Sequence, residues 1–383
     1  MRVLCVIGTR PEAIKLAPVV RELRRRAGGA GSAAEVKVCL TAQHREMLDQ
    51  VLRLFEIQAE YDLDVMTEDQ TPSRVAAAVL ERLEPILQRE RPTWVLVQGD
   101  TTTVAAAALA AFYAGTRLGH VEAGLRTRDK WQPFPEEINR RVATVIADLH
   151  FAPTEWARQN LLREQVPAED IVVTGNPVID ALHWVAGLPP ERGAWDDTPA
   201  DGPNVSPRLI LVTAHRRENF GPPLERICAA LREIAARYGD RVRVVYPVHP
   251  NPNVREPVVR LLGDLPNVRL LPPVDYRTLA RLLKQAHLVL TDSGGIQEEA
   301  PAFGKPVLVL REVTERPEGV EAGTARLVGT DRARIVGEAV RLLEDAQAYD
   351  RMAQARNPYG DGHAAERIVA ALCARMGTGV GDR

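Results

Sequence analysis

The first half of the chain alternates short apolar runs with longer amphipathic segments. Each run ends at a polar turn and is nearly continuous in its hydrophobic character, as expected for strands that are covered on both faces of a parallel sheet. The segments between the runs have the length and pattern of crossover helices. Strands are predicted at residues 3–7, 36–40, 94–97 and 117–121, and helices at about 11–26, 43–55 and 101–114.

The second half repeats this rhythm, which predicts a second sheet of the same kind. The fold class is therefore α/β, with two Rossmann-like, doubly wound domains. Such sheets bind ligands outside the carboxyl ends of their strands, so two of them facing each other would form a cleft. The second set of strands is predicted at residues 208–212, 242–248, 268–271, 287–290 and 306–310.

The length of 383 residues also suits two hydrophobic cores. We predict an N-terminal domain at residues 1–175 and a C-terminal domain at 176–363. Residues 364–383 begin with a helical pattern that no strand follows, so we expect this helix to cross back to the first domain. Residues 187–207, rich in Pro, Gly and Asp, are predicted to be a loop.

Composition excludes several classes of protein. The chain is 45% hydrophobic and 26% charged, which is typical of a globular domain rather than of disorder. No run of about 20 apolar residues predicts a membrane span, and a net charge of -2 gives no general reason to bind nucleic acid. The four cysteines are scattered without CxxC spacing, so we expect buried free thiols and a cytoplasmic protein.

Two strand-to-helix turns have the residues of an anion site. The first strand runs into the string GTRPEAIK, where Arg10 and Lys15 are placed to reach an anion at a helix start, unless both are simply solvated charges. The string TDSGGIQEEA follows a strand of the second half. Its small residues Ser293, Gly294 and Gly295 let backbone N–H groups approach a diphosphate, and a glutamate one turn later suits a ribose diol.

Three carboxylates in the first half follow predicted strands or begin a helix. Asp100 and Glu136 each have a structural alternative, as the N-cap of a helix and as a first-turn charge. Glu122 ends an apolar strand, where a carboxylate needs a partner or a function. Opposed carboxylates in a partly desolvated site are suited to moving a proton at carbon.

Two histidines follow strands of the second half. His215, flanked by arginines, is placed to donate to a diphosphate or to stabilise a departing one, and His249 has an equal alternative as a loop-positioning residue. No His, Asp or Cys spacing predicts a metal site.

Ten ordered motifs of the chain resemble those of one family, the bacterial-type non-hydrolysing UDP-N-acetylglucosamine (UDP-GlcNAc) 2-epimerases, over essentially the whole length. They are GTRPEAIKLAPV from Gly8, TAQHREMLDQVL from Thr41, QGDTTT from Gln98, HVEAGLRT from His120, PFPEEINR from Pro133, TGNPVID from Thr174, TAHRREN from Thr213, TDSGGIQEEAP from Thr291, GKPVLVLREVTERPE from Gly304 and NPYGDG from Asn357.

The resemblance implies a glycosyltransferase-B architecture, a homodimer, and no metal or nicotinamide cofactor. It also implies interconversion of UDP-GlcNAc and UDP-ManNAc by anti elimination of UDP to 2-acetamidoglucal and re-addition, which supplies UDP-ManNAc for cell-surface polysaccharides. The motifs match Asp100, Glu122, Glu136 and His215 to the family's catalytic residues. They match Arg10, Lys15, Arg140, Ser293, Gly294, Gly295, Glu299 and Arg316 to its UDP-binding residues.

The resemblance further implies activation by UDP-GlcNAc at an effector site, in segments that contain Gln43, Arg216, Arg217 and His249. The chain departs from some regulated members at Glu46, in residues 66–70 and 128–132, and at Leu279. We therefore expect activity to be retained and regulation to be in question. The alternatives are a glycosyltransferase of the same architecture, a hydrolysing epimerase that releases free ManNAc, and a sugar-nucleotide sensor. Joint retention of the four catalytic candidates argues against the sensor.

Overall fold

The computed structural model describes residues 1–27, 35–41, 45–65, 70–189 and 207–375, which divide into two compact units. Unit 1 contains Met1–Ala181 and Tyr359–Arg383, and unit 2 contains Leu182–Pro358. The sequence placed the boundaries at residues 175 and 363, whereas the structure divides the chain inside a helix at Ala181 and again after Pro358. Most of the predicted 187–207 loop, and the chain end after residue 375, lie outside the described residues.

Unit 1 is built on a parallel sheet with the strand order β3-β2-β1-β4-β5-β6-β7. The strands are β1 (Arg2–Ile7), β2 (Glu35–Leu40), β3 (Tyr61–Asp62), β4 (Trp94–Gln98), β5 (Arg117–Val121), β6 (Leu149–Ala152) and β7 (Ile171–Val173). The helices are α1 (Arg10–Ala27), α2 (Arg45–Leu54), α3 (Pro72–Glu90), α4 (Thr102–Tyr113), α5 (Glu136–Ile146), α6 (Glu155–Arg163), the 3-10 turn η1 (Ala168–Asp170), the start of α7 (Pro177–Ala186) and α15 (Ala364–Ala374).

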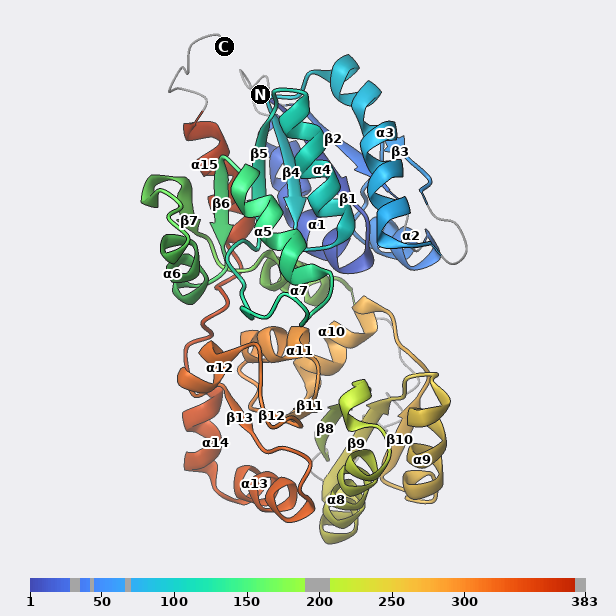
Figure 1. The fold of residues 1–383 in the computed structure, drawn as a ribbon. Helices are drawn as coiled ribbons and strands as arrows, with labels where there is room; N and C mark the ends of the chain where they lie inside the picture. The colour runs from blue at the N-terminus through green and yellow to red at the C-terminus, as the bar shows by residue number, and fades with distance from the viewer. Residues whose placement is uncertain (28–34, 42–44, 66–69, 190–206, 376–383) are drawn as a thin grey trace. The chain divides into compact units, whose positions relative to one another are not determined.

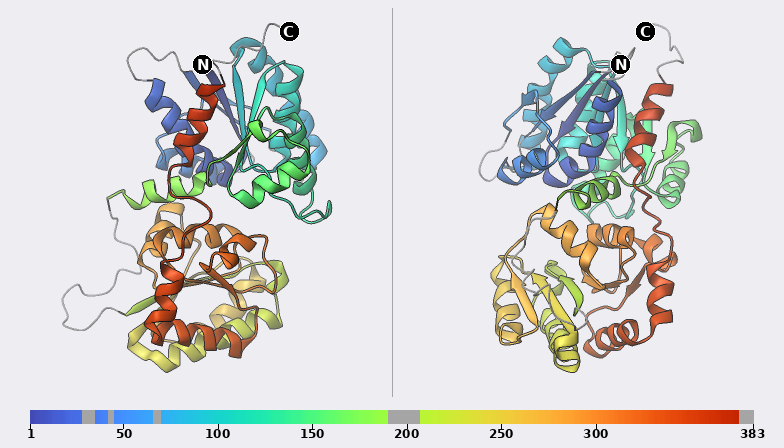
Figure 2. Two further views of the ribbon diagram at one scale, coloured as in Figure 1. Left: turned by 90° about the vertical axis from the view of Figure 1, so that its left-hand side faces the viewer. Right: turned by 180° about the vertical axis from the view of Figure 1, so that it is seen from behind.

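Helices cover both faces of this sheet. On one face α3, α4 and α5 pack side by side (Figure 1). Val79, Leu83 and Ala107 of these helices are buried in one core cluster with Val6 and Val95 of the central strands. On the other face α15 packs against α1 (Figure 2). Burial on both faces explains why the strand sequences are nearly continuous apolar runs rather than alternating ones.

Unit 2 has a second parallel sheet, with the order β10-β9-β8-β11-β12-β13. Its strands are β8 (Arg208–Thr213), β9 (Val242–Pro247), β10 (Val268–Leu271), β11 (Leu288–Thr291), β12 (Val307–Val309) and β13 (Ala325–Leu327). Its helices are the end of α7, α8 (Pro222–Tyr238), α9 (Pro252–Leu262), α10 (Tyr276–Gln285), α11 (Gly294–Glu299), α12 (Pro317–Glu321), α13 (Arg332–Glu344) and α14 (Ala346–Ala353), with the 3-10 turns η2 (Arg217–Asn219), η3 (Gly239–Arg241) and η4 (Ala300–Phe303). Helix α8 packs against α9 and α13 over the hydrophobic core of this unit.

The prediction of two Rossmann-like, doubly wound domains is confirmed. In both sheets the chain winds outward in opposite directions from a central pair of strands, β1 and β4 in unit 1 and β8 and β11 in unit 2. The loops that leave such a pair diverge to opposite faces and open a crevice at the carboxyl ends of the strands. The sequence of each unit therefore directs the residues after these strands to one edge.

Two further expectations concern the whole chain. Cys5, Cys39 and Cys228 are buried free thiols, as predicted, and burial raises the pKa of each to about 12. Cys373 is exposed. None of the helices in the described parts of the chain combines the length and the apolar character needed to cross a membrane.

Candidate active site

The two loops that leave the central strands of unit 1 are joined by a buried carboxylate, Glu12. One oxygen accepts from the N–H of Gly8 at 2.5 Å and the other accepts from the hydroxyl of Thr101 at 2.8 Å. Burial raises the pKa of Glu12 to about 7. Glycine at position 8 lets the backbone lie close to the side chain of Thr103, because a Cβ there would lie 2.6 Å from the hydroxyl oxygen of Thr103. The carboxyl edge of this sheet is thus held together by a side chain from the GTRPEAIK string.

Glu122 lies at the end of β5 with a φ of 64°, in the left-handed region, and its side chain is buried. Its two oxygens lie 2.6 and 2.7 Å from the ammonium of Lys15. The amide of Asn176 donates to one oxygen at 2.8 Å, and the amide of Gln98 donates to the other. An ammonium and two amides thus compensate a carboxylate whose burial would otherwise be costly. Lys15, predicted to reach an anion, contacts Glu122.

Asn176 ties this carboxylate to the returning end of the chain. While its side-chain amide contacts Glu122, its backbone N–H donates to the carbonyl of Tyr359 at 2.7 Å. The neighbouring glycine, Gly175, has a φ of 85°, and a Cβ there would lie 3.1 Å from the Cα of Gly360. Close backbone packing therefore fixes the position from which Asn176 reaches Glu122.

Asp100 follows β4 and pairs with Arg140 of α5. The alternative that Asp100 caps a helix is wrong, because the hydroxyl of Thr101 accepts from the N–H of Val104 at the start of α4. The Asp100 side chain is 26% exposed, so it is paired and still open to solvent. Arg140, predicted to be a cation of the site, holds Asp100 and also lies 3.4 Å from Glu137.

The two adjacent glutamates at the start of α5 have different environments. Glu137 is fully buried and accepts from the backbone N–H groups of Thr127 and Arg128, so it fixes the preceding loop. Glu136 is half-buried, and its Oε2 is enclosed with no hydrogen-bond partner in the described parts of the chain. Of the two glutamates, Glu136 is therefore the one with an oxygen that the described residues do not engage.

In unit 2 the loops after the central strands meet at Asp292, the aspartate of the DSGG string. Its Oδ2 accepts from the N–H groups of His215 and Arg216, both at 2.8 Å, and from the amide of Asn219 at 3.0 Å. The His215 ring stacks on that of His249, with 5.4 Å between the ring centroids. Burial lowers the pKa of His215, although Asp292 opposes this effect and His249 and Arg216 add to it.

The other predicted UDP-binding residues of unit 2 are in or near α11. Ser293 precedes the helix, Gly294 begins it and is buried, and Gly295 is exposed. Glu299 is buried one turn later. Arg316 pairs with Glu298, so the first glutamate of the EEA string has a structural partner. In unit 1, Arg10 is half-buried at the first position of α1.

The predicted effector residues are only partly described. Gln43 lies outside the described residues, as do residues 66–69, and nothing is described of the Glu46 side chain. Arg216 lies 4.0 Å from Glu315, and Arg217 is exposed at the start of η2. His249 is exposed, and its Nδ1 accepts from the N–H of Asn251 at 3.2 Å. Leu279 is half-buried in α10.

Sequence reasoning missed several residues that hold the predicted ones in place. Gln98, Asn176 and Glu12 lie in quoted motifs, but their partners are distant in sequence. Asp292 follows a strand directly, and that position was a signal for a role beyond the glycine-rich turn. Among the described residues, no group of three or more His, Cys, Asp or Glu side chains could hold a metal ion.

These features define an α/β enzyme of two doubly wound units. One unit carries carboxylates that are paired with cationic side chains, and the other carries a histidine beside a glycine-rich turn. A family model described as UDP-N-acetylglucosamine 2-epimerase matches residues 27–373. The UDP-N-acetylglucosamine 2-epimerase of Yersinia pestis is 54% identical over 381 residues, covering 97% of this chain and 98% of that protein. That of Escherichia coli K12 is 54% identical over 375 residues, with the same shares covered.

Solved structures agree with these matches. A UDP-GlcNAc 2-epimerase from Neisseria meningitidis, bound to UDP-GlcNAc, has a TM-score of 0.84 at 45% identity, covering 98% of this chain and 100% of that one. One from Methanocaldococcus jannaschii, in complex with UDP-GlcNAc and UDP, has a TM-score of 0.76 at 32% identity and the same shares. The chain belongs to the UDP-N-acetylglucosamine 2-epimerase family, which confirms the resemblance of its motifs. A glycotransferase of kitacinnamycin, at 15% identity and a TM-score of 0.62, shares the fold.

Proposed function

We propose that this protein is a non-hydrolysing epimerase that interconverts UDP-GlcNAc and UDP-ManNAc at C2 of the sugar. The observation that carries the proposal is the placement of Glu122 against Lys15, Asn176 and Gln98, because these three donors orient a buried carboxylate. Support also comes from the Neisseria meningitidis relative, whose structure is bound to UDP-GlcNAc. The product would supply cell-surface polysaccharide synthesis.

The proposed reaction has two balanced steps. A carboxylate takes the proton from C2, the C–H electrons form the C1–C2 double bond, and the C1–O bond breaks so that UDP leaves with its electrons. UDP then adds back to C1 of the bound 2-acetamidoglucal, and a carboxylic acid returns a proton to C2 on the opposite face. Asp100, Glu122 and Glu136 are the proposed proton-transfer groups, since general acid–base catalysis needs carboxyl groups within reach of the carbon.

The proposed nucleotide contacts divide into two kinds. Lys15 and Arg140 pair with Glu122 and Asp100, so part of their role is to orient these carboxylates. His215 is proposed to stabilise the departing diphosphate. The remaining contacts to UDP are assigned to Arg10, Ser293, Gly294, Gly295, Glu299 and Arg316.

The decisive experiment follows the sugar in deuterated water by proton NMR. With UDP-GlcNAc and the purified protein, we expect UDP-ManNAc to accumulate and deuterium to enter C2 of both nucleotides, because the removed proton exchanges with solvent. Free ManNAc with UDP would identify the hydrolysing reaction instead. Recovery of unlabelled UDP-GlcNAc, or transfer of the sugar to an added acceptor, would reject the proposal.

Activation by UDP-GlcNAc as an effector is part of the proposal. Arg216, Arg217 and His249 are assigned to the effector site, together with Gln43. Arg216 and His249 both neighbour His215, so an anion bound there would act on the proposed diphosphate site directly. A sigmoidal dependence of rate on UDP-GlcNAc concentration would support this assignment, and a hyperbolic one would oppose it.

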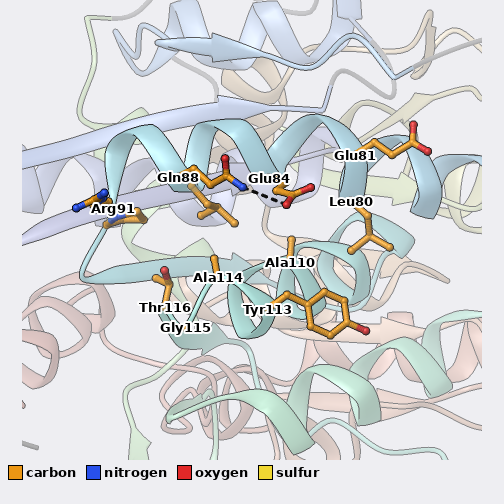
Figure 3. A pocket seen from close by; sticks show the side chains of 12 residues that line it. Leu80, Glu81, Glu84, Gln88, Arg91, Ala110, Tyr113, Ala114, Gly115 and Thr116 are labelled. Atoms are coloured by element: carbon orange, nitrogen blue, oxygen red, sulfur yellow. Dashed lines mark hydrogen bonds between the residues drawn. The ribbon is translucent and has the colours of Figure 1, made fainter. Parts of the chain in front are cut away.

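A surface of unit 1 away from the carboxylates supports the proposal of a homodimer. A hollow of about 700 Å³ lies between α3 and α4, bordered by Arg91 and Thr116, which lie just before β4 and β5 and so at the sheet edge opposite the carboxylates. Glu84, Gln88 and Tyr113 also line it (Figure 3). The hollow carries both acidic and basic side chains, which suits a contact between two copies of one surface.

Three large apolar side chains are exposed at the ends of the neighbouring helices. Phe112 is 64%, Tyr113 is 73% and Val145 is 87% exposed, and α4 and α5, which carry them, pack together. Clustered apolar exposure of this kind marks interaction sites. The proposed occupant is a second copy of the chain.

Replacing Val145 by glutamate tests the dimer. Because a twofold contact would bring two added charges into one apolar interface, Val145→Glu is expected to shift the mass in solution from dimer to monomer, measured by light scattering after size exclusion. Val259→Glu is the matched control, since Val259 is 49% exposed on α9 of unit 2. A Val145→Glu protein that stays dimeric, or a wild-type monomer, would contradict this surface.

A further inference from the structure

The two carboxylate oxygens of Asp292 have different environments. Oδ2 accepts from three donors, the N–H groups of His215 and Arg216 and the amide of Asn219. Oδ1 is enclosed and has no hydrogen-bond partner among the residues that the structure describes, although Asp292 is completely buried. A buried polar atom without a partner destabilises the folded protein, so this arrangement calls for a function.

The group that Oδ1 faces is the imidazole of His215. The distance from Oδ1 to Nδ1 of His215 is 3.9 Å, which is close enough for an electrostatic contact and too long for a hydrogen bond. The His215 side chain is 43% exposed, so it has room to turn toward the carboxylate, whereas Asp292 is fixed by its three donors. A small rotation of the histidine therefore closes the contact.

We propose that Asp292 is the positioning residue of His215, accepting the Nδ1 proton and leaving Nε2 to face the diphosphate of the substrate. This inference rests on the proposed function and names a part of the site that the sequence motifs did not assign. Its physical basis is that the partner of one ring nitrogen decides which nitrogen carries the proton in a neutral imidazole. An acceptor-only carboxylate requires N–H at Nδ1.

The charges around the ring explain what this arrangement does. Partial burial of the ring lowers the pKa of His215 in the free protein, and His249 and Arg216 add to this effect, while Asp292 opposes it by favouring the imidazolium form. A bound diphosphate adds negative charge on the Nε2 side. The imidazole then takes a proton from solvent at Nε2, and the cation lies between the Asp292 carboxylate and the diphosphate that leaves. Asp292 thus makes His215 responsive to the nucleotide.

His249 provides an internal contrast. Its Nδ1 accepts from the backbone N–H of Asn251, so its neutral ring must carry the proton on Nε2. The two stacked histidines are therefore expected to be opposite tautomers. This difference is measurable in the free protein and does not depend on any substrate.

The test is an imidazole nitrogen NMR experiment on protein labelled with 15N-histidine, at a pH where His215 is neutral. Of the eight histidines, His215 is assigned by the signals that disappear in His215→Gln. We expect the wild-type protein to show His215 protonated at Nδ1. In Asp292→Asn, the amide oxygen still accepts the three N–H bonds, and its NH2 group faces Nδ1, so the proton is expected to move to Nε2.

Activity supplies the second readout. Asp292→Asn is expected to lower kcat by about 100-fold, because the neutral ring no longer becomes a cation beside the departing diphosphate, while the Kd for UDP changes less than about threefold. The matched control is Asp331→Asn, where the side chain caps α13 and asparagine caps equally well. It should change neither tautomer nor kcat.

Two outcomes overturn the inference. One is a wild-type His215 protonated at Nε2, and the other is an Asp292→Asn enzyme with unchanged kcat. If Asp292→Asn does not fold, the wild-type tautomer alone decides. Failure of the proposed function is distinct, since a protein that leaves UDP-GlcNAc unchanged can still show the His215 tautomer set by Asp292.

Discussion

Glu122→Gln is expected to abolish nearly all epimerisation, lowering turnover by about 100-fold to 10,000-fold, the range for removal of a general acid–base group. Glutamine keeps the size of the side chain and still accepts from the ammonium of Lys15, but it cannot take a proton from C2. Binding of UDP, measured by calorimetry, should stay within about threefold of wild type, because the substitution leaves the glycine-rich turn of unit 2 intact.

The loss should be seen in two independent measurements. Incorporation of deuterium at C2 should fall together with formation of UDP-ManNAc, since both require proton removal. Glu155→Gln is the control, because the Glu155 side chain is 61% exposed on α6 and contacts Arg158 and Gln159 of its own helix. A Glu122→Gln enzyme with wild-type turnover would refute the role of Glu122 in proton transfer. A variant whose melting temperature is strongly lowered would show that Glu122 is needed for the stability of the fold.

Asp100→Asn is expected to lower turnover by about 100-fold or more for a related reason. The substitution removes the charge that pairs with Arg140 and the acidic proton that Asp100 can carry. The fold should be retained, since Thr101 rather than Asp100 caps α4. Turnover and the thermal unfolding midpoint are measured together.

The exposed Asp350 of α14, in unit 2, provides the comparison variant Asp350→Asn, which should behave as wild type. Arg140→Lys separates the two contributions of the pair. It keeps the positive charge and loses the planar fork that orients a carboxylate, so an intermediate loss of turnover is expected. If Arg140→Lys and Asp100→Asn were both fully active, proton transfer by Asp100 would be rejected.

The fold was largely predictable because strands with buried faces leave apolar runs in the sequence. The strands that were not predicted are β3, β6, β7 and β13, which have two to four residues. A run that short has no measurable periodicity of its own, and each of these strands is defined by its pairing with a neighbouring strand. The sequence of β6, LHFA, is an example, since its place is set by the register with β5.

The site was predictable to the extent that its residues follow strands. Parallel strands end at one edge of a sheet, so the positions of Asp100 and Glu122 directly after two strands were enough to predict both as site residues. Their partners were not predictable, because Glu122 is separated along the chain from Lys15 by 107 residues and from Asn176 by 54. The distinction between Glu136 and Glu137 likewise depends on which side chain turns toward the loop at Thr127 and Arg128.

The backbone hydrogen bond between Asn176 and Tyr359 links Glu122 to the chain segments that connect the two units. The polypeptide leaves unit 1 after Ala181 and re-enters it at Tyr359, so Asn176 stands beside both covalent connections to unit 2. Asp180 provides a second contact between these chain segments, since its carboxylate accepts hydrogen bonds from the N–H groups of Ala364 and Ala365. Asn176, whose side-chain amide donates to Glu122, is therefore hydrogen-bonded to the first residue of the returning chain, so a displacement of Tyr359 would act on the position of that amide.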